Sequence, residues 1–265
     1  SYTITQSPMH GEITIGEVAS SSSLSFDGVD DYMEISDPYT SFSNAITAGM
    51  WVKASQASTG SGVGQATSGV DNNVASNVWL LHFNGGTSLN FYVNDGGTWR
   101  SVGSTTNLVD NNWHYIVGVA DESETALYID GVKEGQGPGI TNGIMINTSS
   151  VVHIGKDVRY PTGRFLTGAI DDVCIWNQAL TMEQIQANMY SGLSGDEDGL
   201  QGYWNFNEGS GDMVYDMSGN GNSGTIYGAS WEAGEQSEST FTYTPYSNFH
   251  GTDFFSYYAS DGYED

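Results

Sequence analysis

The sequence predicts an all-β fold, built as a sandwich of antiparallel sheets. Among its 265 residues are 35 glycines but only 5 prolines, and clusters of turn-forming residues separate many short segments. Within these segments, apolar and polar residues alternate with the two-residue period of a half-buried strand. The pair Asp130-Gly131 directly follows one such segment and predicts a tight hairpin.

The alternation also predicts which face of each strand is buried. In residues 23–28 the apolar pair is Leu24 and Phe26. Residues 168–176 (GAIDDVCIW) are predicted to carry Ile170, Asp172, Cys174 and Trp176 on one face and Asp171, Val173 and Ile175 on the other. Cys174 is the only cysteine, so no intrachain disulfide forms, and we expect a buried, unreactive thiol.

One α-helix is predicted within residues 180–192. Thr181 is the expected N-cap, Gln184 completes a capping box, and Gly192 lies just past the end. The apolar stripe, which is expected to pack against the sandwich, consists of Met182, Ile185 and Met189.

The two ends of the chain are predicted to be halves of one small β domain. Residues 1–19 and 238–265 each contain two strand-like segments, and neither piece is long enough to bury a core alone. Residues 20–237 have a complete pattern of their own, so we expect a larger domain inserted into the smaller one, with Val18 and Glu238 close together. Both ends stop in mid-pattern, which is typical of a segment of a longer chain. A domain that is presented by a host domain in this way indicates a binding function.

The charge balance limits the possible partners. The chain has 32 acidic and 6 basic residues, a net charge of −26, so the cations that neutralise nucleic acid phosphates are missing. An anionic membrane surface is disfavoured for the same reason, and no apolar run of about 20 residues predicts a membrane span. The acidity indicates solubility in a salty medium, calcium binding, or both.

Five motifs in the central part of the chain occur in the order typical of one family. They are residues 23–35, 46–54, 111–135, 165–189 and 200–231, beginning with SLSFDGVDDYMEI and including NNWHYIVGVADESETALYIDGVKEG and FLTGAIDDVCIWNQALTMEQIQANM. In these motifs the chain resembles the laminin-G-like family of the concanavalin A-like superfamily, in the form found in large bacterial surface and secreted proteins. The resemblance implies a jelly roll of two antiparallel sheets with six or seven strands each.

The flanks resemble a second family. YTITQSPMHGEITI near the start and the FxGTDxFxYxxSDG pattern in residues 249–262 resemble the tandem cadherin-like, immunoglobulin-like repeats of large bacterial adhesins of the RTX, type I-secreted style. This resemblance implies an extracellular protein at the bacterial cell surface, with neighbouring repeats of the same long chain as partners.

The main candidate calcium site joins two motifs. Its carboxylates are Asp27, Asp30 and Asp31 in one turn and Asp171 and Asp172 in the strand near residue 170. Gly28 permits a sharp turn, and the family resemblance implies a structural calcium ion between the two motifs. The alternative is an ordinary turn with solvated carboxylates. A weaker candidate contains Asp216, Asn220 and Asn222, for which a turn satisfied by its own side chains is the better explanation.

The candidate sugar-binding residues are aromatic platforms and planar polar groups. They are Trp99, Arg100, Tyr160 and Arg164, together with Asp71, Asn72 and Asn73. The last three lie in the Gly/Ser/Asn-rich segment 55–77, which we expect to be a functional loop. The alternative for each arginine is an ion pair with a nearby carboxylate.

No catalytic motif is apparent. The closely spaced Glu-x-Asp-x-x-Glu arrangement of glycosidases with this sandwich fold does not occur, and the five histidines are scattered. The sequence therefore predicts a non-enzymatic, calcium-stabilised extracellular module of an adhesin that binds a carbohydrate or glycoconjugate. The alternatives are a spacer or protein–protein contact domain in an adhesin stalk, and an accessory module of a polysaccharide-degrading enzyme.

Overall fold

The chain divides into two compact units. The computed structural model describes residues 2–17, 22–36, 42, 44–67, 77–144, 150–160, 162–233, 239–253 and 256–259. The larger unit is Ser22–Glu232, and the smaller unit consists of Ser1–Ser21 and Ala233–Asp265. Among the helices in these ranges, none has the length and apolar character needed to cross a membrane.

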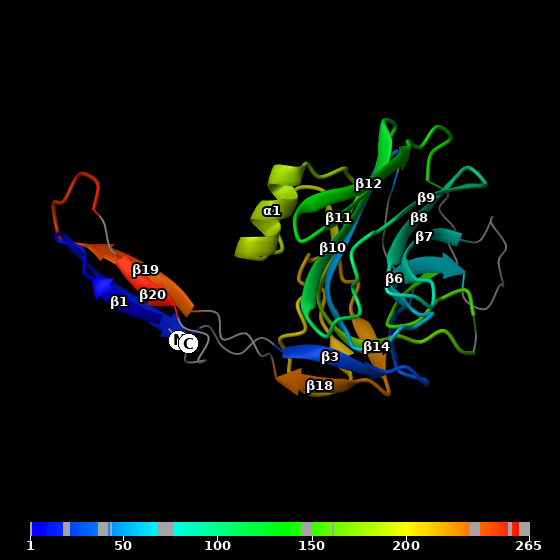
Figure 1. Ribbon diagram of the computed structural model, residues 1–265, viewed down its shortest axis with the longest axis horizontal. Coiled ribbons are helices and arrows are strands. Elements are labelled where there is room, and N and C mark those ends of the chain that lie inside the picture. Colours follow the sequence, from blue (N-terminus) through cyan, green and yellow to red (C-terminus); the bar gives the residue numbers. More distant parts are fainter. Residues whose placement is uncertain are drawn as a thin grey trace. The chain divides into compact units, whose positions relative to one another are not determined.

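The first sheet of the larger unit is built from strands spread over its whole length (Figure 1). They are β3 (Ser22–Asp27), β5 (Ile46–Ala54), β10 (Trp113–Ala120), β11 (Glu124–Ile129), β12 (Val132–Pro138), β14 (Thr167–Trp176), β15 (Leu200–Trp204) and β18 (Ser230–Ala233). Their order is β12-β11-β10-β5-β14-β3-β18, and β15 pairs with the last four residues of β14.

The second sheet faces the first. Its strands are β4 (Tyr32–Ile35), β6 (Ser61–Thr67), β7 (Asn77–Phe83), β8 (Leu89–Asp95), β9 (Thr98–Gly103), β13 (Ser150–Ile154), β16 (Met213–Val214) and β17 (Gly224–Tyr227), in the order β16-β17-β4-β13-β6-β7-β8-β9. Within the described residues each sheet has eight strands, not six or seven, because the segment after residue 199 adds the short strands β15 to β18.

The core between the sheets confirms the predicted sandwich. Large side chains from both inner faces meet there, and Leu24 and Phe26 belong to it as predicted. The two layers come so close that a Cβ atom on Gly118 of β10 would lie 2.4 Å from the ring of Phe91 on β8. Only glycine fits at this crossing. The predicted hairpin after β11 is also confirmed, since Asp130 and Gly131 have φ angles of 51° and 73°.

A β-bulge corrects the predicted faces of β14. Pairing with β5 shifts register between Asp171 and Cys174, and Asp172 has a φ of 48°. The extra residue moves the alternation by one position. Ile170 therefore shares the inner face with Val173 and Ile175, whereas Cys174 and Trp176 face outward.

The helix α1 (Met182–Ser191) covers the outer face of the first sheet. The capping box of Thr181 and Gln184 is confirmed, as is the end at Gly192. Ile185 is fully buried and Met189 packs on the same cluster, which includes Cys174 and Trp176, so the thiol is buried as predicted. The prediction was wrong for Met182, which is 42% exposed and lies outside the packed part of the stripe.

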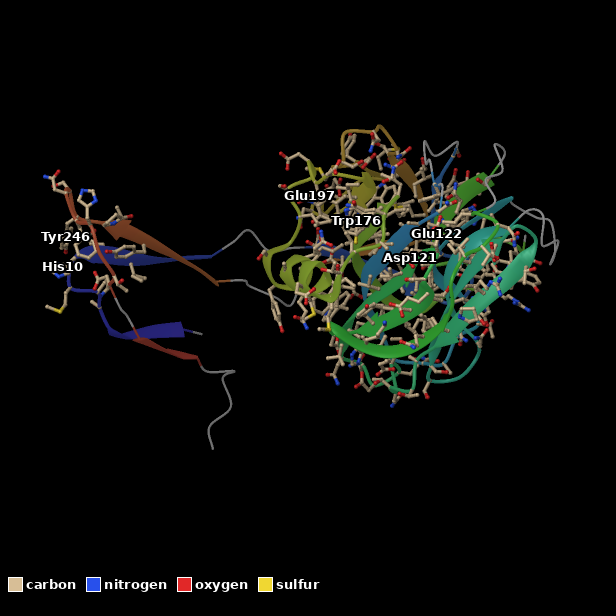
Figure 2. All side chains as sticks on the ribbon, turned by 90° about the horizontal axis from the view of Figure 1, so that it is seen from above. His10, Asp121, Glu122, Trp176, Glu197 and Tyr246 are labelled. Atoms are coloured by element: carbon tan, nitrogen blue, oxygen red, sulfur yellow. The ribbon has the colours of Figure 1, made fainter. Side chains whose placement is uncertain are left out.

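The smaller unit pairs the two ends of the chain. Strand β1 (Tyr2–Gln6) pairs with β20 (Ser256–Ala259), and β2 (Gly11–Glu17) pairs with β19 (Ser239–Pro245). At one end of this unit, Tyr246 N donates to His10 O at 2.8 Å, and both side chains are seen there in Figure 2. Val18 and Glu238 lie outside the described residues, although their neighbours Glu17 and Ser239 are paired. The cadherin-like character of this unit stays a prediction.

Candidate ligand-binding face

The candidate site lies on the outer face of the second sheet, which points away from the core. Three side chains of its strands, Ala66, Leu80 and Tyr92, meet Val158 there in a small cluster. Val158 belongs to the 155–166 hairpin, which we define as residues 155–166. This hairpin lies across the outer face of the strands. Pro161 is outside the described residues. The hairpin is closed by backbone bonds from Asp157 N to Arg164 O and from Leu166 N to Gly155 O.

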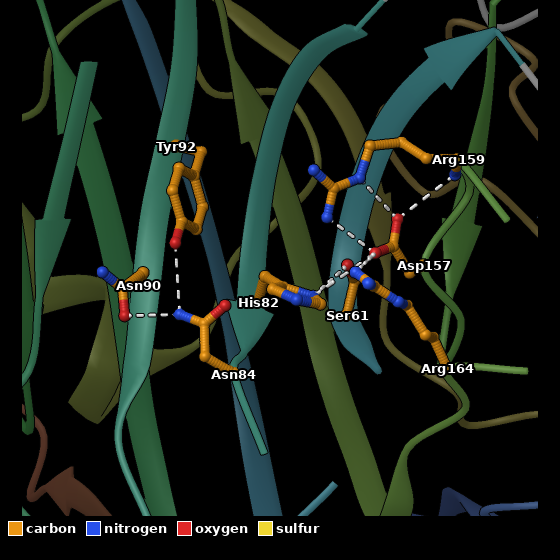
Figure 3. Close-up of polar contacts among 8 residues, drawn as sticks. All are labelled: Ser61, His82, Asn84, Asn90, Tyr92, Asp157, Arg159 and Arg164. Atoms are coloured by element: carbon orange, nitrogen blue, oxygen red, sulfur yellow. Dashed lines mark hydrogen bonds and ion pairs between the residues drawn. The ribbon is translucent and has the colours of Figure 1, made fainter. Parts of the chain in front are cut away.

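A buried carboxylate anchors this hairpin. Asp157 is fully buried and accepts two hydrogen bonds from the Arg159 guanidinium, at 2.8 and 2.7 Å (Figure 3). Arg164 Nη1 lies 3.4 Å from the same carboxylate. Burial alone would raise the pKa of Asp157, but the hydrogen bonds and charge of Arg159 hold it below its usual range. The hairpin is therefore fixed by an ionised, fully paired aspartate.

His82 of β7 lies beside this carboxylate. Its Nδ1 atom is 3.1 Å from Ser61 Oγ and 3.8 Å from Asp157 Oδ2. Burial, with the charges of Arg159 and Arg164 adding to it, lowers the pKa of His82 to about 4 against the pull of Asp157. A Ser-His-Asp triad uses the two different ring nitrogens of histidine. Here both contacts involve Nδ1, so the trio does not form a catalytic triad.

Polar and aromatic groups next to this anchor face solvent. Asn84 Nδ2 donates to Asn90 Oδ1 at 2.8 Å and to the Tyr92 hydroxyl at 3.1 Å (Figure 3). The Trp99 ring packs edge-on against Tyr92, with centroids 6.0 Å apart. In the hairpin, the Arg164 guanidinium lies 3.7 Å from the Tyr160 ring centroid.

Arg164 is held in an unusual conformation. Its φ is 63°, in the left-handed region that non-glycine residues rarely adopt. Two anchors keep it there: the Asp157 carboxylate and the Tyr160 ring. The Arg164 side chain is nevertheless 38% exposed, so part of the guanidinium is directed at solvent from a fixed position. A preorganised donor of this kind is suited to recognising a ligand.

The acidic turn between β3 and β4 is a separate candidate, for a metal ion. Ligand atoms of Asp27, Asp30 and Asp31 lie within 4.8 Å of one another. Asp31 Oδ2 already accepts from Asp27 N at 2.9 Å, and Asp31 is only 8% exposed. Burial raises the pKa of Asp31, and the charges of Asp27 and Asp30 raise it further. A divalent cation would relieve this repulsion, so the donor set fits calcium.

The structure does not bring the other two predicted ligands to this turn. Asp27 pairs with Thr167, and Asp171 lies four residues further along β14, roughly 13 Å away at the rise of a β-strand. Asp172 sits in the bulge and accepts a 2.7 Å hydrogen bond from the Tyr203 hydroxyl. The register of β3 and β14 separates the two motifs, so any calcium ion in the turn is bound without Asp171 and Asp172.

The weaker metal candidate is a closed turn in the structure. The Asp216 carboxylate accepts from the backbone N–H groups of Tyr203, Ser218 and Asn222. The Asn220 side chain donates to Leu200 O at 3.0 Å. These contacts agree with a turn that is satisfied by its own groups.

Comparison with known proteins identifies the larger unit. The family model of the concanavalin A-like lectin/glucanases superfamily, Laminin_G_3, matches residues 27–186. The chain belongs to this superfamily. No curated protein sequence matches the chain significantly.

Solved structures share the laminin-G-like fold at low identity. A candidate carbohydrate-binding protein from Bacteroides ovatus matches with a TM-score of 0.64 and 17% identity over 83% of this chain and 61% of its own. The present chain thus spans about three fifths of that protein. The heptameric SAP-like pentraxin of Limulus polyphemus matches with a TM-score of 0.56 and 16% identity, over 82% of this chain and 97% of its own.

The structure places the predicted sugar-binding residues in different parts of the larger unit, and their role in binding stays a prediction. Trp99 lies against Tyr92 on the outer face, and Tyr160 belongs to the 155–166 hairpin. Arg100 belongs to the opposite side of β9, where it pairs with the buried Asp95 at 2.7 Å. Neighbouring strand residues point to opposite faces, so Trp99 and Arg100 cannot serve one site. Asp71, Asn72 and Asn73 lie outside the described residues.

Three polar residues of the face were missed. Asn90 and Tyr92 occupy alternate positions of β8, and Asn84 follows β7. The alternation of polar Asn90 and Tyr92 with buried Leu89, Phe91 and Val93 was a usable signal for a shared outward face. Their position next to the 155–166 hairpin could not be predicted from the sequence, because it depends on contacts between segments that are far apart in the chain.

Proposed function

We propose that the chain is an extracellular carbohydrate-binding module. One observation carries the proposal: Tyr92, Trp99 and Tyr160 lie on one face beside exposed amide and guanidinium groups of Asn84 and Arg164. Aromatic rings stack on the apolar faces of sugars, and planar polar groups pair with their hydroxyls. The superfamily and the Bacteroides ovatus structure support this assignment.

We further propose that calcium stabilises the module through the turn of Asp27, Asp30 and Asp31. The proximity of the three carboxylates and the raised pKa of Asp31 support this site. Calcium would supply charge compensation in the turn that joins β3 to β4, and thereby stabilise this connection between the two sheets.

The wider context is proposed to be a bacterial adhesin at the cell surface. In this proposal the smaller unit is a cadherin-like repeat, split by insertion of the larger one and followed by further repeats of the same chain. The pairing of β1 with β20 and of β2 with β19 supports the split, since strands from the two chain ends form common sheets. Many copies along a stalk would add avidity. No catalytic role is proposed.

A glycan array tests the function. We expect binding by the intact chain and a loss of at least tenfold in affinity for Asn84→Ala and Tyr160→Ala, because each removes a contact group without opening the core. Tyr190→Ala is the matched control, since Tyr190 is 75% exposed on α1, over the other sheet. Absence of binding to every glycan would favour the spacer alternative. Binding of free polysaccharide fragments alone would favour the accessory module.

A further inference from the structure

The side chain of Lys156 forms no ion pair with any carboxylate in the described residues. Within the described residues, four of the six basic side chains form ion pairs: Arg100 with Asp95, Lys133 with Glu124, and Arg159 and Arg164 with Asp157. Lys156, by contrast, makes no hydrogen bond or ion pair in the part of the chain that the structure describes.

Burial makes the missing partner significant. Lys156 is only 7% exposed, and its Nζ lies 4.4 Å from the ring centroid of Tyr32 and 5.4 Å from that of Phe165. Cation–π contacts offset part of the desolvation of an ammonium group but leave its three N–H donors unused. Burial lowers the pKa of Lys156. The negative charge of Glu34 acts in the opposite direction but is the smaller effect.

The nearby carboxylate is already engaged. Glu34 Oε2 lies 2.9 Å from His153 Nε2, and Glu34 Oε1 accepts from Ser36 Oγ at 2.7 Å. In the described residues, the other ring nitrogen of His153 is buried and has no hydrogen-bond partner. Within the described residues, two polar groups beside the Tyr32 ring thus have no hydrogen-bond partner: the buried Nδ1 atom of His153 and the Nζ atom of Lys156.

An exposed aromatic platform completes the arrangement. Tyr227 of β17 stacks on Tyr32, with centroids 4.7 Å apart and an angle of 14° between the rings, and is 44% exposed. Tyr32 contacts both Tyr227 and Lys156, so the platform and the cation are within the span of a disaccharide. This group occupies the outer face of the second sheet at β17, β4 and β13, beside the face described above, and the 155–166 hairpin links the two.

We propose that this part of the face is a subsite for an acidic saccharide, with Lys156 binding its anionic group and Tyr227 stacking on its ring. The subsite rests on the proposed carbohydrate-binding function and specifies the ligand class. The anionic group is a carboxylate or a sulfate ester, both of which accept charge-assisted hydrogen bonds from an ammonium group.

The experiment uses the intact chain and matched glycans. Neutral, carboxylated and sulfated forms of the same backbones are compared on an array, and the best matched pair is then measured by calorimetry. We expect at least tenfold preference for an acidic form, about 1.4 kcal/mol. Lys156→Met should lose this preference and keep the affinity for the neutral form, whereas Lys156→Arg should retain it. The carboxylated and sulfated arms show which group is bound.

A melting curve separates ligand binding from a structural role. Because Lys156 is buried without an anionic partner, Lys156→Met should not lower the melting temperature. Equal affinity of the intact chain for neutral and acidic forms would overturn the proposed subsite. A preference for the acidic form that persists in Lys156→Met would overturn it as well. Either result would leave the proposed carbohydrate-binding function standing. Failure to bind any glycan would overturn both.

Discussion

His82 is expected to make the candidate binding face less stable when the pH is lowered. Its pKa is lowered from 6.5 to about 4 by burial, so the folded state binds the proton less readily than the unfolded state. The charged groups facing it are Asp157, Arg159 and Arg164. A group with a lowered pKa of this kind costs no stability above pH 6.5 and costs progressively more as the pH falls towards 4.

The magnitude follows from the two pKa values. A difference of about 2.5 pKa units is worth about 3.4 kcal/mol once the pH is below both values. Between pH 7 and pH 5 the linkage relation gives a loss of about 2 kcal/mol from His82. For a domain of this size, such a loss lowers the melting temperature by about 4–8 °C.

The assay compares the intact chain with His82→Gln, which cannot take up a proton but keeps a polar group near Ser61. Urea unfolding at pH 7 and pH 5 should show a fall in the free energy of unfolding that is about 2 kcal/mol larger for the intact chain than for the variant. Contributions from the other histidines cancel in this difference. Equal falls in both proteins would refute the reasoning, because His82 would then titrate alike in the folded and unfolded states.

Two further predictions concern stability. Calcium at 10 mM should raise the melting temperature by about 3–10 °C, given the affinity typical of extracellular calcium-binding modules. Asp31→Asn should abolish this rise. A melting temperature that does not change when a chelator is added would contradict the proposed calcium site. Gly118→Ala should lower the free energy of unfolding by at least about 1–3 kcal/mol, because its Cβ would meet the Phe91 ring. Gly86→Ala, with nothing within 4 Å, is the control, and equal effects of the two substitutions would contradict the proposed crossing.

Local patterns in the sequence predicted the elements that depend on near neighbours. The capping box of Thr181 and Gln184, the Asp130-Gly131 turn and the burial of Leu24 and Phe26 all follow from residues a few positions apart. Their physical basis is hydrogen bonding and side-chain direction within one turn or strand, which the order of residues determines by itself. The all-β sandwich follows from the sum of such patterns.

The tertiary structure decided what depends on register and on contacts between distant segments. The bulge at Asp172 reversed the face of Ile170, and the pairing of Asp27 with Thr167 kept Asp171 away from the acidic turn. Burial and charge are likewise properties of the assembled sheets. They tie Arg100 to Asp95 and leave Lys156 beside Tyr32 with no ion pair among the described residues. The sequence alone therefore determined a sandwich and a set of candidate groups, whereas packing decided which of those groups share a face, because strand register is set by the whole core.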